Sequence, residues 1–118
     1  MSVQVRRVYE DPEPDGGARV LVDRLWPRGV AREDLNLDRW AREAAPSTEL
    51  RKWYGHRPER FDEFRGRYLT ELEAPAAAVA VQELRRLAEG PGVTLLTATR
   101  EVDRSGARVL ADALQSGT

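Results

Sequence analysis

Residues 93–98 read Val-Thr-Leu-Leu-Thr-Ala, and this short apolar run decides the fold class. Gly90-Pro91-Gly92 precedes it and a polar segment, 99–103, follows it, so both ends are marked by residues that interrupt regular structure. A continuous apolar run bounded in this way predicts a strand that is covered on both faces. Helical patterns flank it at 77–88 and from about Arg104 to Leu114. This order of helix, loop, strand, loop and helix is typical of layered α/β domains.

Other segments towards the amino terminus also favour strands. Residues 3–9 are β-prone, and Ala18 to Asp23 is nearly continuous in its apolar character. The Pro- and Gly-rich stretch 10–17 between them is expected to be a surface loop. The segment 37–43 can add a fourth strand, although the apolar spacing over 37–45 also fits a helix that Pro46 would end early. We predict a single α/β domain over residues 1–118, with about three to four mainly parallel strands and about four to five helices.

The middle of the chain is predicted to be helical. Ser47 is a suitable cap for a helix that begins at Thr48, and Gly55-His56 interrupts that helix. Pro58 stands at the start of the next one. In the last helix, either Asp103 or Ser105 can act as the cap. The apolar residues of the helix after Pro58 recur at helical spacing and predict the most amphipathic helix of the chain: Phe61, Phe64, Tyr68, Leu69 and Leu72.

Composition excludes several classes of function. The 19 cationic residues are balanced by 20 acidic ones, which argues against nucleic-acid binding because such domains usually carry a positive excess. The absence of Cys and the single His, His56, exclude a thiolate nucleophile and a multi-histidine metal site within one chain, so we expect no cofactor. No apolar run approaches the ~18 residues of a membrane span, and the amino terminus has no secretory pattern. We expect a soluble cytoplasmic protein.

Two predicted strands end in polar loops that carry arginine. Ligands bind beyond the carboxyl ends of strands in open α/β sheets. If the strands 18–23 and 93–98 are parallel neighbours, the side chains that follow them should converge on one crevice. Guanidinium groups there would suit a phosphate or a carboxylate. The predicted ligand-binding residues in these loops are Arg24, Trp26, Arg28 and Arg100. Lys52, from the helical segment that begins at Thr48, is predicted to add positive charge to the same anion site.

The candidate catalytic and ligand-binding residues also have structural interpretations. Asp23 is a candidate catalytic residue, but it can equally form an ion pair at the end of a strand. His56 is a candidate general acid–base, since an imidazole titrates near neutrality, or simply a residue at a helix end. Trp26 can be a plug in the core, and Lys52 can be a solvated side chain. These alternatives stay open at this point.

The chain resembles a family in three blocks. Residues 7–12 (Arg-Val-Tyr-Glu-Asp-Pro), 21–29 (Leu-Val-Asp-Arg-Leu-Trp-Pro-Arg-Gly) and 45–58, with the aromatic Tyr68 beyond them, are similar to the YeaO-like proteins, a domain of unknown function. The resemblance spans nearly the whole chain and implies a compact α/β domain and a cytoplasmic location. It implies no reaction.

One departure from the family pattern bears on activity. Members of the family tend to have an aromatic residue after the apolar strand and a His-Asn pair further on, whereas this chain has Thr97 and Arg104-Ser105. Any shared chemistry that needs the imidazole would be lost, while anion binding would survive.

Two hypotheses for the function remain. The first is a small anion-binding domain, with or without processing of the ligand. The second is a non-catalytic interaction module such as a homodimer or an adaptor, for which aromatic residues supply interface anchors.

Overall fold

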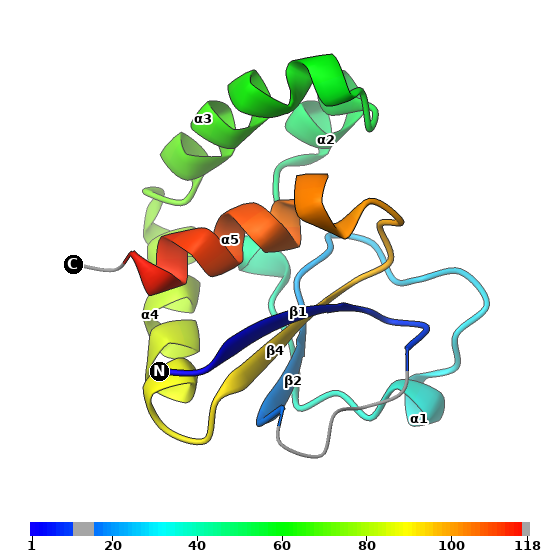
Figure 1. Cartoon of the computed structure of the whole chain (residues 1–118), viewed down its shortest axis with the longest axis vertical. Coiled ribbons are helices and arrows are strands. Elements are labelled where there is room, and N and C mark those ends of the chain that lie inside the picture. Colours follow the sequence, from blue (N-terminus) through cyan, green and yellow to red (C-terminus); the bar gives the residue numbers. More distant parts are fainter. Residues whose placement is uncertain (11–15, 117–118) are drawn as a thin grey trace.

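The computed structural model describes residues 1–10 and 16–116. Most of the expected surface loop 10–17 therefore lies outside the described residues. The elements follow one another along the chain as shown in Figure 1. They are β1 (Val3–Arg7), β2 (Ala18–Leu21), α1 (Arg32–Leu35), β3 (Arg39–Trp40), α2 (Thr48–Tyr54), α3 (Phe61–Glu71), α4 (Pro75–Glu89), β4 (Val93–Thr97) and α5 (Gly106–Gln115). Three short 3₁₀ turns join them at Arg42–Ala44, Pro58–Arg60 and Val102–Arg104.

The strands form one parallel sheet in the order β1-β4-β2-β3, which confirms the predicted α/β class and its parallel sheet. The segment 37–43 contributes a two-residue strand and then a 3₁₀ turn, rather than a helix. Strand β4 occupies the centre, and all five of its residues are buried. Both faces of this strand are covered, which explains the apolar run in its sequence.

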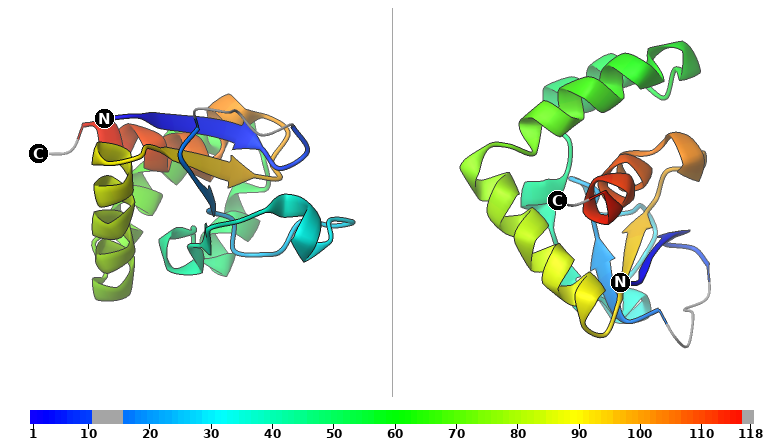
Figure 2. Two further views of the ribbon diagram at one scale, coloured as in Figure 1. Left: turned by 90° about the horizontal axis from the view of Figure 1, so that it is seen from below. Right: turned by 60° about the vertical axis from the view of Figure 1, so that its left-hand side comes forward.

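The two faces of the sheet pack against different partners. Because neighbouring residues of a strand point to opposite faces, Leu95 joins the larger core with α2 to α5, while Leu96 joins a smaller core with Leu35 of α1. Helix α5 lies beside β1, and α3 and α4 bend around it (Figure 2). Helices α4 and α1 lie at opposite sides of the molecule (Figure 1).

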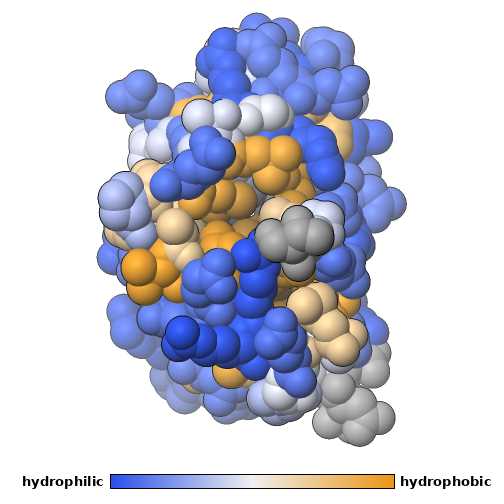
Figure 3. Space-filling view, turned by 90° about the vertical axis from the view of Figure 1, so that its left-hand side faces the viewer, coloured by the Kyte–Doolittle hydropathy of each residue, from blue (hydrophilic) through white to orange (hydrophobic). Residues whose placement is uncertain are grey.

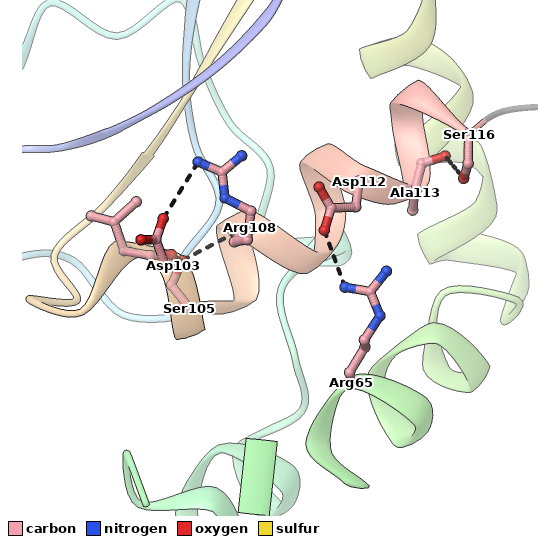
Figure 4. Close-up of polar contacts among 8 residues, drawn as sticks. Arg65, Asp103, Ser105, Arg108, Asp112, Ala113 and Ser116 are labelled. Atoms are coloured by element: carbon pink, nitrogen blue, oxygen red, sulfur yellow. Dashed lines mark hydrogen bonds and ion pairs between the residues drawn. The ribbon is translucent and has the colours of Figure 1, made fainter. Parts of the chain in front are cut away.

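The helix ends follow the predicted caps in part. The Oγ of Ser47 accepts the backbone N–H of Leu50, which confirms the predicted cap of α2. The Oγ of Ser105 accepts the N–H of Arg108 at 3.1 Å, so Ser105 caps α5 and Asp103 does not (Figure 4). Asp103 instead lies 3.9 Å from the Arg108 guanidinium.

Helix α3 is less one-sided than its apolar spacing predicts. Phe64 and Tyr68 are buried, but Leu69 is 37% exposed. An ion pair between Arg65 of α3 and Asp112 of α5, at 3.1 Å, links the two helices (Figure 4). Helix α5 has the more consistent buried face.

Candidate functional site

A cavity of about 430 Å³ lies at the carboxyl ends of β2 and β4. This is the position where ligands bind in open α/β sheets, and the volume suits a small molecule. Its lining combines aromatic walls with a few ionisable groups: Tyr9, Val22, Asp23, Arg24, Leu25, Trp26, Pro27, Arg28, Pro46, Arg51, Tyr54, His56, Phe64, Ala98, Thr99, Ser105 and Gly106.

Asp23 ties the end of β2 to the end of β4. Its Oδ1 accepts the hydroxyl of Thr97 at 2.7 Å, and its Oδ2 accepts the backbone N–H of Ala98 at 2.8 Å. Burial raises the pKa of the Asp23 carboxyl, and these two hydrogen bonds, with the positive field of His56 and Arg51, oppose that rise. No ion pair involves Asp23 among the residues that the structure describes, so the expected ion pair at the strand end is not formed there.

Arg24 lines the cavity, but its guanidinium binds the protein's own backbone. The Nε donates to the carbonyl of Pro46 at 2.9 Å, and Nη2 donates to the carbonyl of Ala45 at 3.2 Å. The same irregular segment is held from other sides, since the hydroxyl of Tyr68 donates to the carbonyl of Ala44 and Glu71 accepts the N–H of Ser47. A segment without regular structure must find partners for its backbone groups, and here side chains supply them.

Trp26 is both a wall of the cavity and part of the smaller core. Its Nε1 donates to the carbonyl of Val30 at 2.7 Å, and its ring meets that of Trp40 edge-on with centroids 5.3 Å apart. Trp40 in turn donates to the carbonyl of Asp23 at 2.7 Å. On the far side, Trp26 borders a second, smaller cavity of about 270 Å³. The two indoles therefore fix the shape of the loop that follows β2.

Arg28 and Arg51 bring positive charge to the cavity, and the imidazole of His56 lines it as well. All three side chains are exposed as well as lining it, and they come from the loop after β2, from α2 and from the turn after α2. His56 has a left-handed backbone, with a φ of 57°, and its ring centroid lies 6.1 Å from that of Tyr54. Within the described ranges, neither guanidinium donates to a carboxylate.

Two of the predicted ligand-binding residues do not line this cavity. Lys52 is exposed on α2 and is absent from the lining, whereas its neighbour Arg51 is present. Residues three apart share a helix face, so Arg51 lies with Tyr54, and Lys52 is turned about 100° away. Arg100 is also exposed outside the lining, because the chain turns after β4 where the N–H of Thr99 bonds the hydroxyl of Thr97. Arg100 therefore does not line this cavity with Arg24 and Arg28.

Sequence reasoning overlooked Arg51 as a member of the site. The signal was present, because Arg51 stands three residues before Tyr54 on the face that packs inward. Tyr9 was also missed, and nothing in its local sequence indicates that it meets the loop after β2. The structure brings its hydroxyl within 3.5 Å of the carbonyl of Arg28, 19 residues further along the chain.

Comparisons with known proteins identify the family. A family model described as the inactive DUF488-N3 subclade matches residues 2–118. The chain belongs to this family. Among its YeaO-like relatives, an uncharacterized protein of Mycobacterium tuberculosis is 54% identical over 112 residues, covering 95% of this chain and 92% of the relative. The uncharacterized protein YeaO of Escherichia coli is 44% identical over 119 residues, covering 98% and 99%. No solved structure matches the chain.

Family membership confirms the resemblance seen in the three sequence blocks. Thr97 and Arg104-Ser105 stand where the resemblance implied an aromatic residue and a His-Asn pair. In the fold these residues have structural roles: Thr97 holds Asp23, the carbonyl of Arg104 accepts the hydroxyl of Tyr54, and Ser105 caps α5.

Neither a metal cluster nor a membrane-spanning helix is found in the described part of the chain. Over residues 1–10 and 16–116, no group of three or more His, Asp or Glu side chains could hold a metal ion. Nor is any helix in these ranges both long enough and apolar enough to cross a membrane.

We expect Arg24→Ala to lower the free energy of unfolding by about 2 kcal/mol, because two carbonyls lose a charged donor. Arg24→Lys should recover less than half of this loss, since one ammonium cannot reproduce the planar fork. Urea denaturation followed by tryptophan fluorescence measures both. Unchanged stability in Arg24→Ala would contradict the role of Arg24 in holding the carbonyls of Ala45 and Pro46. Arg24 would then again be a candidate for binding a ligand.

Proposed function

We propose that this protein binds a small phosphorylated or carboxylated molecule in the cavity at the ends of β2 and β4. The observation that carries the proposal is the group of cations around it. Arg28 and Arg51 line the cavity without a carboxylate partner among the described residues, and His56 lies beside them. Guanidinium groups bind phosphate and carboxylate through paired, charge-assisted hydrogen bonds.

The rest of the cavity lining favours binding of an anion by Arg28 and Arg51. Apolar and aromatic walls, such as Phe64, Tyr54 and Trp26, lower the local dielectric constant and strengthen the attraction of an anion. The description of the family model as inactive favours binding without processing of the ligand. The absence of His at the position of the family's His-Asn pair points the same way.

The test compares two adjacent cations that differ in their position. Arg51→Ala removes a charge that lines the cavity, and Lys52→Ala removes the same charge one residue away and outside the lining. We expect Arg51→Ala to weaken the binding of propyl phosphate, measured by isothermal titration calorimetry, by about tenfold or more. Lys52→Ala should change the dissociation constant by less than about twofold, because exposed charges act weakly through water.

The control makes the outcomes separable. Since both variants change the net charge equally, a long-range effect would weaken binding equally in both. Equal losses would therefore contradict a specific site at Arg51. No heat of binding from the wild-type protein with propyl phosphate, propionate or inorganic phosphate would contradict the proposed function itself.

A protein-interaction module is the second candidate, and one observation favours it. Apolar residues gather across the middle of the face shown in Figure 3, between hydrophilic rims. On α4, Val79 is 60% exposed and contributes apolar surface outside the core. Light scattering distinguishes a homodimer from a monomer, and a strict monomer at high concentration would remove the homodimer from consideration.

A further inference from the structure

The carboxylate of Asp23 is an unusual group for a cavity that otherwise carries positive charge. Both of its hydrogen-bond partners, Thr97 and Ala98, are neutral. Its neighbour Arg24 uses the guanidinium on the carbonyls of Ala45 and Pro46. Carboxylates that are removed from water are normally paired with a cation, and within the described residues this one is not.

The carboxylate of Asp23 can also accept further hydrogen bonds. Two carboxylate oxygens together offer about four lone-pair positions, and the contacts to Thr97 and Ala98 use one on each oxygen. Asp23 lines the cavity, so the remaining positions are available to a bound molecule. A donor placed there would complete the coordination of a group that the fold itself leaves half satisfied.

The cavity lining carries acidic and basic side chains from different elements. The acidic region is Asp23, at the junction of β2 and β4, and the basic region is Arg28, Arg51 and His56, from the loop after β2, from α2 and from the turn after α2. The field of His56 and Arg51 reaches the Asp23 carboxyl, although neither makes an ion pair with it. A simple anion would satisfy the basic region while being repelled by Asp23. A molecule with charges of both signs would satisfy both.

We propose that the bound molecule is a small zwitterion, whose phosphate or carboxylate meets Arg28 and Arg51 and whose ammonium group donates to the carboxylate of Asp23. Aminoalkyl phosphates and amino acids belong to this chemical class. The proposal rests on the anion-binding function proposed above and specifies its ligand. It assigns Asp23 a binding role in addition to its structural bond between the two strands.

The test uses pairs of compounds that differ only in the amino group. Alkyl phosphates of two, three and four carbons are compared with the ω-aminoalkyl phosphates of the same length, by isothermal titration calorimetry on the wild-type protein. At the length that best fits the cavity, we expect the amine to bind about tenfold or more tightly than the plain phosphate. Using three lengths removes the need to know the distance between the two charged regions in advance.

A variant of Asp23 provides the matched control. Asp23→Asn keeps the size of the side chain but removes its charge, so the advantage of the amine over the plain phosphate of equal length should fall below about twofold. An advantage that persists in this variant would overturn the assignment to Asp23. If the variant does not fold, the three wild-type comparisons decide alone.

The possible failures are distinguishable. Equal affinity of amines and plain phosphates for the wild-type protein at every length would overturn the zwitterion and leave the anion site standing. Binding of no compound in either series would overturn both proposals together.

Discussion

Gly17→Ala is expected to lower the free energy of unfolding by more than about 3 kcal/mol, a large effect for a single methyl group. Gly17 has a φ of 69°, where an L side chain is strained by about 1–2 kcal/mol. A Cβ there would lie 2.2 Å from the carbonyl oxygen of Gly92 and 2.7 Å from that of Pro91. Both are backbone atoms, so no side chain can rotate away from the new methyl group.

The position explains why relaxation is costly. Gly17 and Gly92 stand immediately before β2 and β4, and the N–H of Ala18 donates to the carbonyl of Gly92 at 2.9 Å. Separating the two backbones would therefore open the central strand pair of the sheet at its first hydrogen bond. Heat and urea denaturation, followed by circular dichroism, measure the loss.

Two other glycines separate the effect of backbone strain from the effect of steric overlap. Gly29 has a φ of 74°, but a Cβ there would meet no atom within 4 Å, so Gly29→Ala should show only the conformational cost of about 1 kcal/mol. Gly66 lies in α3 with open space around it, and Gly66→Ala should stabilise the protein by about 0.5–1 kcal/mol. A Gly17→Ala variant as mild as Gly29→Ala would contradict the close approach of the two strands.

Tyr68→Ala is expected to cost about 3–5 kcal/mol, as for a large aromatic residue in a packed core. Tyr68 is fully buried, and its ring lies 5.8 Å from that of Phe64 by centroids. Its hydroxyl donates to the carbonyl of Ala44, and burial raises its pKa, so it remains a donor throughout the physiological range. Tyr68 thereby joins α3 to the segment whose carbonyls Arg24 also binds.

A smaller change isolates the hydroxyl. Tyr68→Phe keeps the ring and should cost about 1–3 kcal/mol, because the carbonyl of Ala44 is left without its donor in a dry environment. Leu69→Ala, at the next position on α3, should cost less than about 1 kcal/mol because Leu69 is 37% exposed. Urea denaturation measures all three variants. A Tyr68→Phe protein as stable as the wild type would show that water replaces the hydroxyl, contrary to this packing.

Local patterns predicted the elements well because their causes are local. The cap at Ser47 depends on residues within one helical turn, and the buried run 93–98 reports directly that both faces are covered. Where two residues could each cap a helix, as with Asp103 and Ser105, the local pattern did not indicate which of them does so. The choice depends on where the chain enters α5, and Ser105 is the residue directly before its first turn.

The chain alone therefore determined the parallel α/β class and the order of its elements, because hydrophobic periodicity and caps act over a few residues. Only the tertiary structure decided which arginines line the cavity at the strand ends. Arg24 meets carbonyls more than 20 residues away, and Arg51 rather than Lys52 faces the cavity. The contacts of Arg24 depend on how distant segments pack, which no local pattern in the sequence shows. The i, i+3 spacing of Arg51 and Tyr54 indicated a shared helix face, but not the cavity beside it.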